Sequence, residues 1–267
     1  MTSTQNTSST IYKIDRSKII WTVGIIVIGI LALLMTRRKN VSQINNAIVK
    51  ITHLDNGNKD FIDSADVLVI LKHALDGDIK DERVGRLNVA NIELILNQDP
   101  FIEKAQVYVT ALDNLSITVK QREPICRIID NAGGNYYLDK TGFRMPLSKH
   151  FSARVPIITG NISLYDPDFL KKNNTLRNVF YLVQTLENDD FFRPLIQQIS
   201  VDAGGEFTLI PVLGDQKIRI GDAADLDDKM NRLKIFYREA LPYEGWNTYS
   251  TISVKYKGQI VCKKRAG

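Results

Sequence analysis

The sequence predicts an α+β protein with three parts: an N-terminal transmembrane helix, a small domain ordered strand-helix-helix-strand-strand, and a β-rich domain of antiparallel strands with helices packed on one side. Three observations predict this fold class. An uncharged apolar run lies near the N-terminus, helical and alternating patterns are mixed after it, and short β-rich runs between turn residues fill the second half. A chain of 267 residues is long enough for two such domains.

These patterns divide the chain into segments. Residues 1–18 form a polar tail without an apolar pattern, which predicts disorder. Residues 19–35 form the transmembrane helix, 40–121 the small domain and 122–267 the β domain.

The transmembrane helix is predicted from the run IIWTVGIIVIGILALLM, Ile19 to Met35, which carries no charge. About 20 apolar residues cross the hydrocarbon core of a bilayer as a helix, and the ring of Trp21 is expected at the headgroups. No small-residue cleavage site follows Met35, so the run is interpreted as an uncleaved anchor rather than a signal peptide. Basic residues are equally numerous on its two sides, so charge leaves its orientation open.

The small domain begins with a β-branched run at residues 48–54, which predicts its first strand. Apolar residues at helical spacing predict a helix over 65–75, with Ser64 as its N-cap, and a second helix over 89–98. Residues 107–119 alternate between apolar and polar around the turn ALDN, which predicts a hairpin with one buried face.

The β domain is predicted from short β-rich runs separated by turns. They are ICRIID, YYLD, RVPIITG, QQISVD, FTLIPV, KIRIG, TISVKY and QIVCKK. Helical spacing predicts helices over residues 169–186 and 226–241. In the second helix, Leu233 and Phe236 are expected to face the sheet.

The tetrapeptide Asp139-Lys140-Thr141-Gly142 raises the question of an aspartyl-phosphate enzyme, since ion-pumping ATPases carry their phosphorylated aspartate in this sequence. Such an enzyme needs a nucleotide-binding hydrolase domain, and the pump motif continues with threonine where this chain has Phe143. Asp at the first position and Gly at the last are typical of a four-residue turn. We therefore predict a turn between two strands.

The residue types that carry catalysis or hold metals form no motif in this sequence. Nucleophile-elbow, zinc-peptidase, phosphate-loop and dinucleotide signatures are absent. Cys126 and Cys262 are far apart and are interpreted as buried, and His53, His73 and His150 are isolated, so no metal site is predicted. The net charge of +5 is spread along the chain, which argues against nucleic-acid binding. We expect a protein that is not an enzyme and uses no cofactor or small-molecule substrate.

The stretch TISVKYKGQIVCKKR, residues 251–265, places two strand-like runs around Lys257-Gly258. The last strand of a sheet has a free edge, which is a template for a strand of a partner protein. The terminal basic residues suit an acidic partner. A plain solubilising tail is the alternative that the sequence leaves open.

Several stretches, in this order and spacing, carry a resemblance to a known family. They are NIELILNQDPFIEKAQVYV, LSITVKQREPICRI, YYLDKTGFRMP, VPIITG, KIRIGD, DDKMNRLKIFYREAL and ISVKYKGQIVCKKR. Together they resemble the FtsQ/DivIB family of bacterial cell-division proteins, whose first extracytoplasmic module is a POTRA domain. The resemblance implies a non-enzymatic, single-pass type II protein of the inner membrane, enriched at the division septum. Its tail is then cytoplasmic, and its POTRA-like and β domains are periplasmic.

The resemblance also implies how partners bind. The expected partners, besides the bilayer around residues 19–35, are small coiled-coil single-span division proteins and other septal proteins of the divisome. Binding is expected largely by strand addition at the C-terminal edge, where Tyr256 matches the family's partner-contacting tyrosine. The residues that match the edge strand are Gln259, Ile260, Val261, Cys262 and Lys263. A POTRA-containing chaperone or secretion component for outer-membrane or exported proteins is the alternative function.

Overall fold

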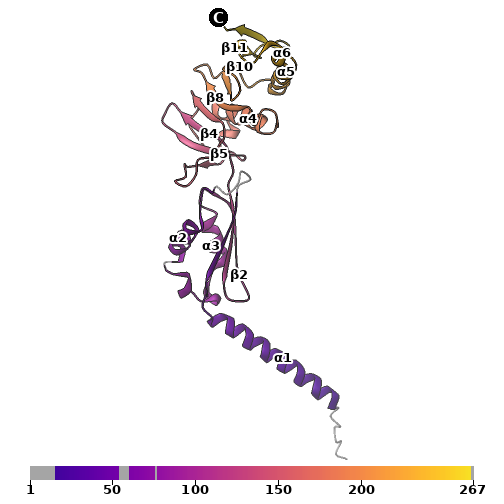
Figure 1. The fold of residues 1–267 in the computed structure, drawn as a ribbon. Coiled ribbons are helices and arrows are strands. Elements are labelled where there is room, and N and C mark those ends of the chain that lie inside the picture. The colour runs from indigo at the N-terminus through magenta and orange to yellow at the C-terminus, as the bar shows by residue number, and fades with distance from the viewer. Residues whose placement is uncertain (1–15, 54–59, 76, 266–267) are drawn as a thin grey trace, which may run out of the picture.

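The structure is a computed structural model that describes residues 16–53, 60–75 and 77–265 of the chain. In Figure 1, helix α1 (Arg16–Val41), a smaller sheet with its helices and a larger sheet with its helices follow one another in chain order. We call the second and third of these the first and second units. Residues 1–15 of the predicted tail lie outside the described part.

Helix α1 contains the predicted transmembrane run. Every side chain that is described in it, from Ile20 to Leu33, is exposed. Across the residues that the structure describes, no helix combines the length and the apolar character that a bilayer crossing requires. The transmembrane helix therefore stays a prediction.

The first unit has the order strand-helix-helix-strand-strand, as predicted. Its elements are β1 (Ala47–Thr52), α2 (Ser64–Leu75), the short 3-10 helices η1 (Ile79–Asp81) and η2 (Val84–Arg86), α3 (Val89–Leu96), β2 (Ile102–Val109) and β3 (Leu115–Gln121). The strand order is β1-β3-β2, with β1 parallel and β2 antiparallel to the central β3. The helices lie in the long connection from β1 to β2, and the predicted hairpin of β2 and β3 is confirmed.

Asp63 caps helix α2, which corrects the prediction that Ser64 does. The carboxylate of Asp63 accepts a hydrogen bond from the N–H of Asp66 at 2.8 Å, and the N–H of Asp63 donates to the carboxylate of Asp66 at 3.2 Å. This reciprocal pair is a capping box, which joins residues three apart. Asp66 stands only two residues after Ser64, so it forms the box with Asp63 and leaves Ser64 as the first helical residue.

The core of the first unit lies between its sheet and its helices. Leu115, Ile117 and Val119 alternate along β3 and are fully buried, together with Val67 and Leu71 of α2. Burial of an aliphatic side chain of this size contributes roughly 1.5–3 kcal/mol to folding. The period-2 pattern of β3 therefore sets which face of the sheet receives the helices.

The second unit is built on a larger sheet. Its elements are β4 (Pro124–Asp130), β5 (Asn135–Asp139), β6 (Arg144–Met145), β7 (Ile157–Gly160), η3 (Phe169–Lys171), α4 (Thr175–Glu187), β8 (Ile196–Val201), β9 (Phe207–Pro211), β10 (Lys217–Gly221), α5 (Leu226–Glu239), α6 (Leu241–Glu244), β11 (Tyr249–Ser253) and β12 (Val261–Lys264). In the described chain the strand order is β12-β11-β10-β9-β8-β7-β4-β5-β6.

The larger sheet is mixed, which corrects the prediction of antiparallel strands. β4 pairs with β7, β7 with β8, and β10 with β11 in parallel. Parallel neighbours need a long crossover connection, usually a helix. Helix α4 lies in the connection from β7 to β8, and α5 lies in that from β10 to β11. The helices that the sequence predicts are thus the crossovers that make their flanking strands parallel.

The prediction that the helices pack on one side of the sheet is confirmed, and Figure 1 shows α4 and α5 on the same side of the strands. Strands β7, β8, β10 and β11 run in one direction, because β9 is antiparallel to both of its neighbours. Each crossover leads from one strand to the next strand on the side nearer β12, and crossovers between parallel strands are right-handed in nearly all proteins. Because the strands run in the same direction and both crossovers move toward the same edge with the same handedness, both helices lie on one face of the sheet.

The predicted helices differ from the observed ones at their ends. Asn174 caps α4, because its side chain accepts a hydrogen bond from the backbone N–H three residues later at 2.8 Å. The predicted first residues of that helix instead form η3. In α5, Leu233 is fully buried as predicted, whereas Phe236 is half-buried and packs against the ring of Tyr249 at 5.9 Å.

The tetrapeptide that begins at Asp139 is the turn between β5 and β6, as predicted. The N–H of Gly142 donates to the carbonyl of Asp139 at 3.0 Å. Gly142 has a φ of +84°, in the left-handed region that favours glycine. The carboxylate of Asp139 accepts from the N–H groups of Thr141 and Phe143, both at 2.8 Å. This carboxylate is therefore occupied in holding the turn.

Candidate functional site

Strand β12 forms one edge of the larger sheet. Among the described residues it pairs with β11, antiparallel, with Cys262 opposite Ile252 and Val261 opposite Ser253. An edge strand presents a row of unpaired N–H and C=O groups on its outer side. This row is what a strand of another protein could pair with.

The register identifies the groups in this row. The N–H of Arg265 donates to the carbonyl of Thr248 at 2.9 Å, so the backbone of Arg265 faces β11. Along an antiparallel strand, successive residues direct their backbone groups to opposite sides. The N–H and C=O groups of Cys262 and Lys264 therefore face away from β11 and make up the free edge.

The side chains of this edge point to two faces of the sheet. Ile260 and Cys262 are partly buried against the core, whereas Val261 is 47% exposed and Lys263 is exposed. Burial raises the pKa of the Cys262 thiol. The thiol is therefore protonated at neutral pH.

Tyr256 and Gln259 lie in the turn that joins β11 to β12. Tyr256 is 51% exposed, and Gly258 has a φ of +71° that a side chain would strain. Strand β12 begins at Val261, so Gln259 and Ile260 precede the edge strand that the sequence assigns them to. The structure thus brings all six predicted residues into one hairpin, and their role in binding stays a prediction.

Arg232 on α5 holds this turn in place, although no motif in the sequence marks it. Its guanidinium donates to the carbonyls of Tyr256 at 3.0 Å, Val254 at 3.2 Å and Gln259. Its Nε also donates to Asp228 at 2.9 Å, one helical turn earlier. The i,i+4 spacing of Asp228 and Arg232 is visible in the sequence, but it indicates only a helix-surface pair. The contacts to the turn depend on tertiary structure.

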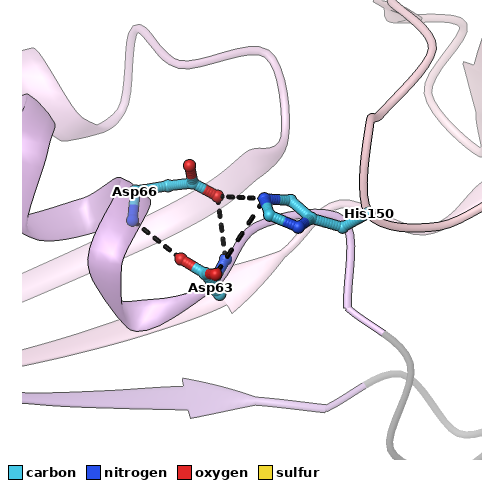
Figure 2. A group of neighbouring side chains, drawn as sticks. All are labelled: Asp63, Asp66 and His150. Atoms are coloured by element: carbon cyan, nitrogen blue, oxygen red, sulfur yellow. Dashed lines mark hydrogen bonds and ion pairs between the residues drawn. The ribbon is translucent and has the colours of Figure 1, made fainter.

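A second group of charged residues lies where the two units meet; we call Asp63, Asp66 and His150 the junction cluster. Figure 2 shows the two carboxylates at the start of α2 facing His150, which lies between β6 and β7. The His150 ring Nε2 is 2.7 Å from an oxygen of Asp66 and 4.0 Å from an oxygen of Asp63. The ammonium of Lys149 donates to the other oxygen of Asp66 at 2.9 Å.

The side chains of the junction cluster are close enough together to hold a metal ion, but a neighbouring lysine already compensates one of the two carboxylates. Its possible ligand atoms lie within 4.8 Å of one another. Asp66 is already paired with the ammonium of Lys149, which repels a second cation. Partial burial raises the pKa of Asp66, but hydrogen bonds from Lys149, the N–H of Asp63 and His150 outweigh it and lower the pKa to about 2. We therefore interpret the cluster as an ion-pair contact between the units.

Aromatic packing reinforces this contact. The ring of Phe61 in the first unit stacks on Phe101 at 5.8 Å, and it meets the edges of Tyr137 at 5.8 Å and Phe151 at 5.3 Å in the second unit. Ser148 donates to the carbonyl of Phe61 at 2.7 Å. Phe61 and Tyr137 are each 1% exposed, so the units share a small apolar core.

Comparison with known proteins finds matches for both units. Residues 47–120 match a family model for a POTRA-like domain, and residues 123–263 match one described as FtsQ/DivIB, C-terminal related. Curated proteins named cell division protein FtsQ are similar to the chain. Those from Geobacter sp. (strain M21) and Rhodothermus marinus are each 29% identical, over 67% and 62% of this chain. The matches cover 65% and 62% of these relatives, so the chain spans less than two thirds of their length.

Proposed function

The chain belongs to the FtsQ/DivIB family of cell division proteins, and we propose that it is a non-enzymatic scaffold of the bacterial division machinery. It binds other division proteins through its two units, largely by accepting a partner strand at the edge of β12. The proposed partners are small coiled-coil single-span division proteins, together with other septal proteins.

The observation that carries this proposal is the free edge of β12. The outward N–H and C=O groups of Cys262 and Lys264 offer a pairing register for one added strand. The exposed ring of Tyr256 lies in the turn beside it. The exposed ammonium of Lys263 favours an acidic segment as the partner.

The scaffold is proposed to be anchored in the cytoplasmic membrane by residues 19–35. The apolar run and the exposure of the described side chains from Ile20 to Leu33 support this anchor. Residues 1–18 then lie in the cytoplasm. Two domains, 40–121 and 122–267, lie in the periplasm, and the protein is enriched at the division septum.

Copurification of the coiled-coil partners tests whether Tyr256, in the turn before β12, contributes to binding. Tyr256→Glu puts a charge in the proposed interface, and we expect it to weaken copurification by about tenfold. Tyr243→Glu is the matched control, because Tyr243 is 89% exposed and lies on α6. Equal recovery of partners by the two variants would remove Tyr256 from the interface.

A proline substitution tests strand addition itself. Lys264→Pro removes an outward N–H while leaving the groups that face β11, a position where edge strands tolerate proline. Lys264→Ala is its control, since it removes the same side chain and keeps the N–H. We expect the proline variant alone to lose partners. If both variants behave alike, backbone pairing at this edge is not the mode of binding.

Depletion in the host tests the role in division. Filamentous cells that are restored by the full chain, but not by a chain ending at Lys257, would support both the scaffold and its edge. Normal division with misassembled envelope proteins would overturn the scaffold in favour of the chaperone alternative.

A further inference from the structure

A groove with a volume of about 350 Å³ lies where the two units meet. One wall comes from α2, the residues just before it and the turn that precedes β2, and the other comes from the loop after β6. Two members of the junction cluster, Asp66 and His150, line it and face each other in Figure 2. We call this space the junction groove.

Apolar side chains that are partly open to solvent line much of the junction groove. Val69 on α2 is 54% exposed and Leu147 in the opposite wall is 42% exposed, while Ile70 and Phe101 also line the groove and are half-buried. Facing apolar side chains that remain exposed in a groove are typical of a site that receives an apolar group.

The same groove holds a carboxylate, that of Asp99, which forms no ion pair with any described residue. One oxygen of Asp99 accepts from the N–H of Phe101 at 2.9 Å, and among the described residues no cation pairs with its carboxylate. Burial, and in smaller part the charge of Asp66, raise the pKa of Asp99. Asp66 itself is already paired with Lys149 and His150. Asp99 is therefore the carboxylate that a cation from outside would stabilise.

We propose that the junction groove binds a segment of a partner protein that carries a lysine or arginine next to a large apolar residue. The apolar side chain packs between Val69 and Leu147, and the cation pairs with Asp99. Lys149 also lines the groove, but its ammonium is paired with Asp66, so Asp99 is the carboxylate left uncompensated. Apolar side chains beside this carboxylate are complementary to a cation next to an apolar residue and disfavour an acidic segment.

The junction groove is separate from the β12 edge. Its second-unit wall follows β6, at one end of the strand order, whereas β12 stands at the other end. The two sites also favour partner segments of opposite charge, because the groove favours a basic segment and the β12 edge favours an acidic one. One chain thus has room for both partners at once.

Methyl NMR of the full chain in detergent micelles, with labelled valine and leucine, tests the proposal. The probes are N-acetyl-Leu-Lys-amide and, as the charge-reversed control, N-acetyl-Leu-Glu-amide. We expect the first probe to shift the methyl signals of Val69 and Leu147, and the second to leave them in place.

Two variants in the groove, each compared with a control elsewhere in the chain, test whether the probe binds there. Asp99→Asn keeps the acceptor for Phe101 and should weaken binding of the lysine probe about fivefold. Asp190→Asn, in an exposed loop of the second unit, should leave it unchanged. Val69→Ser, at an exposed position that does not affect the core, should abolish the shift at Leu147. Tyr256→Glu should leave probe binding intact, which separates this site from the β12 edge.

Three results would overturn the proposal. They are no shift at Val69 and Leu147 with the lysine probe, equal shifts with the two probes, and equal weakening by Asp99→Asn and Asp190→Asn. The last result would mean that the probe responds to net charge rather than to this carboxylate.

Discussion

Asp139 shows how one buried carboxylate connects several parts of the chain. It is 3% exposed. One of its oxygens holds the turn after β5, and the other accepts from Arg122 at 2.8 Å. Arg122 also donates to the carbonyl of Ile102 at the start of β2. The residue that resembled a phosphorylated aspartate in the sequence thus links the β5–β6 turn to the first unit.

Replacement of Asp139 should be costly. Asp139→Ala leaves the Arg122 guanidinium buried without its partner and frees the turn amides, so we expect the free energy of unfolding to fall by about 3–5 kcal/mol. Urea titration measures it. Asp190→Ala, whose side chain is 96% exposed, is the control and should change the value by less than about 0.5 kcal/mol. A loss below about 1 kcal/mol for Asp139→Ala would show that the pair contributes little.

Among elements, helix α5 has one face in the core and one in solvent. Leu233 is fully buried and Ile235, two residues later, is 52% exposed. We expect Leu233→Ala to lower the free energy of unfolding by about 2–5 kcal/mol and Ile235→Ala by less than about 0.5 kcal/mol. Thermal unfolding of the two variants checks this, and similar melting temperatures would contradict the assigned face.

The β11–β12 hairpin depends on α5 through Arg232. Arg232→Met keeps the aliphatic stem and removes the hydrogen bonds to the turn, so the hairpin should open more often. Hydrogen exchange of the Val261 and Lys263 amides, which face β11, should become about tenfold faster. Arg238→Met, at an exposed position on the same helix, is the control. Unchanged exchange in Arg232→Met would mean that β12 pairing holds the turn without the helix.

Elements were predictable where their pattern is local. Alternation along β3 and helical spacing in α5 gave their position and their buried face, because period and burial are properties of neighbouring residues. The sequence did not indicate that Asp63 rather than Ser64 caps α2, because both residue types are good N-caps. The hydrogen bonds that Asp66 exchanges with Asp63 decide between them. Parallel pairing was missed too, since it depends on which strands the crossovers join.

At the scale of the whole molecule, the two units are held by contacts between residues far apart in sequence. His150 and Asp66 are 84 positions apart, so no spacing in the sequence indicated their contact or the junction groove beside it. The terminal edge was predictable for the opposite reason, because its two strands and their turn lie within one short stretch. Its binding role came from the family resemblance.

The junction cluster should make the stability of the whole molecule sensitive to acid. The pKa of Asp66 falls from 3.8 to about 2 on folding, so the carboxylate contributes stability that is present above 3.8 and is lost as the pH drops through about 2. Melting temperatures of Asp66→Asn across this window should fall less steeply than those of the native chain. Lys149→Met should also reduce the slope, because it removes a hydrogen bond that lowers this pKa. Parallel curves for all three proteins would contradict the role of the cluster.

The half-buried thiol of Cys262 on the free edge has a consequence for oxidation chemistry. The thiolate is the reactive form, so the raised pKa slows the reactions of Cys262 with oxidants and alkylating reagents without abolishing them. Cys126 is fully buried and protected further. Both thiols are therefore protected from oxidation, and the structure pairs neither of them in a disulfide. A strand added to β12 would shield Cys262 still more, so the rate at which iodoacetamide labels this position reports directly how much of the protein has its edge occupied.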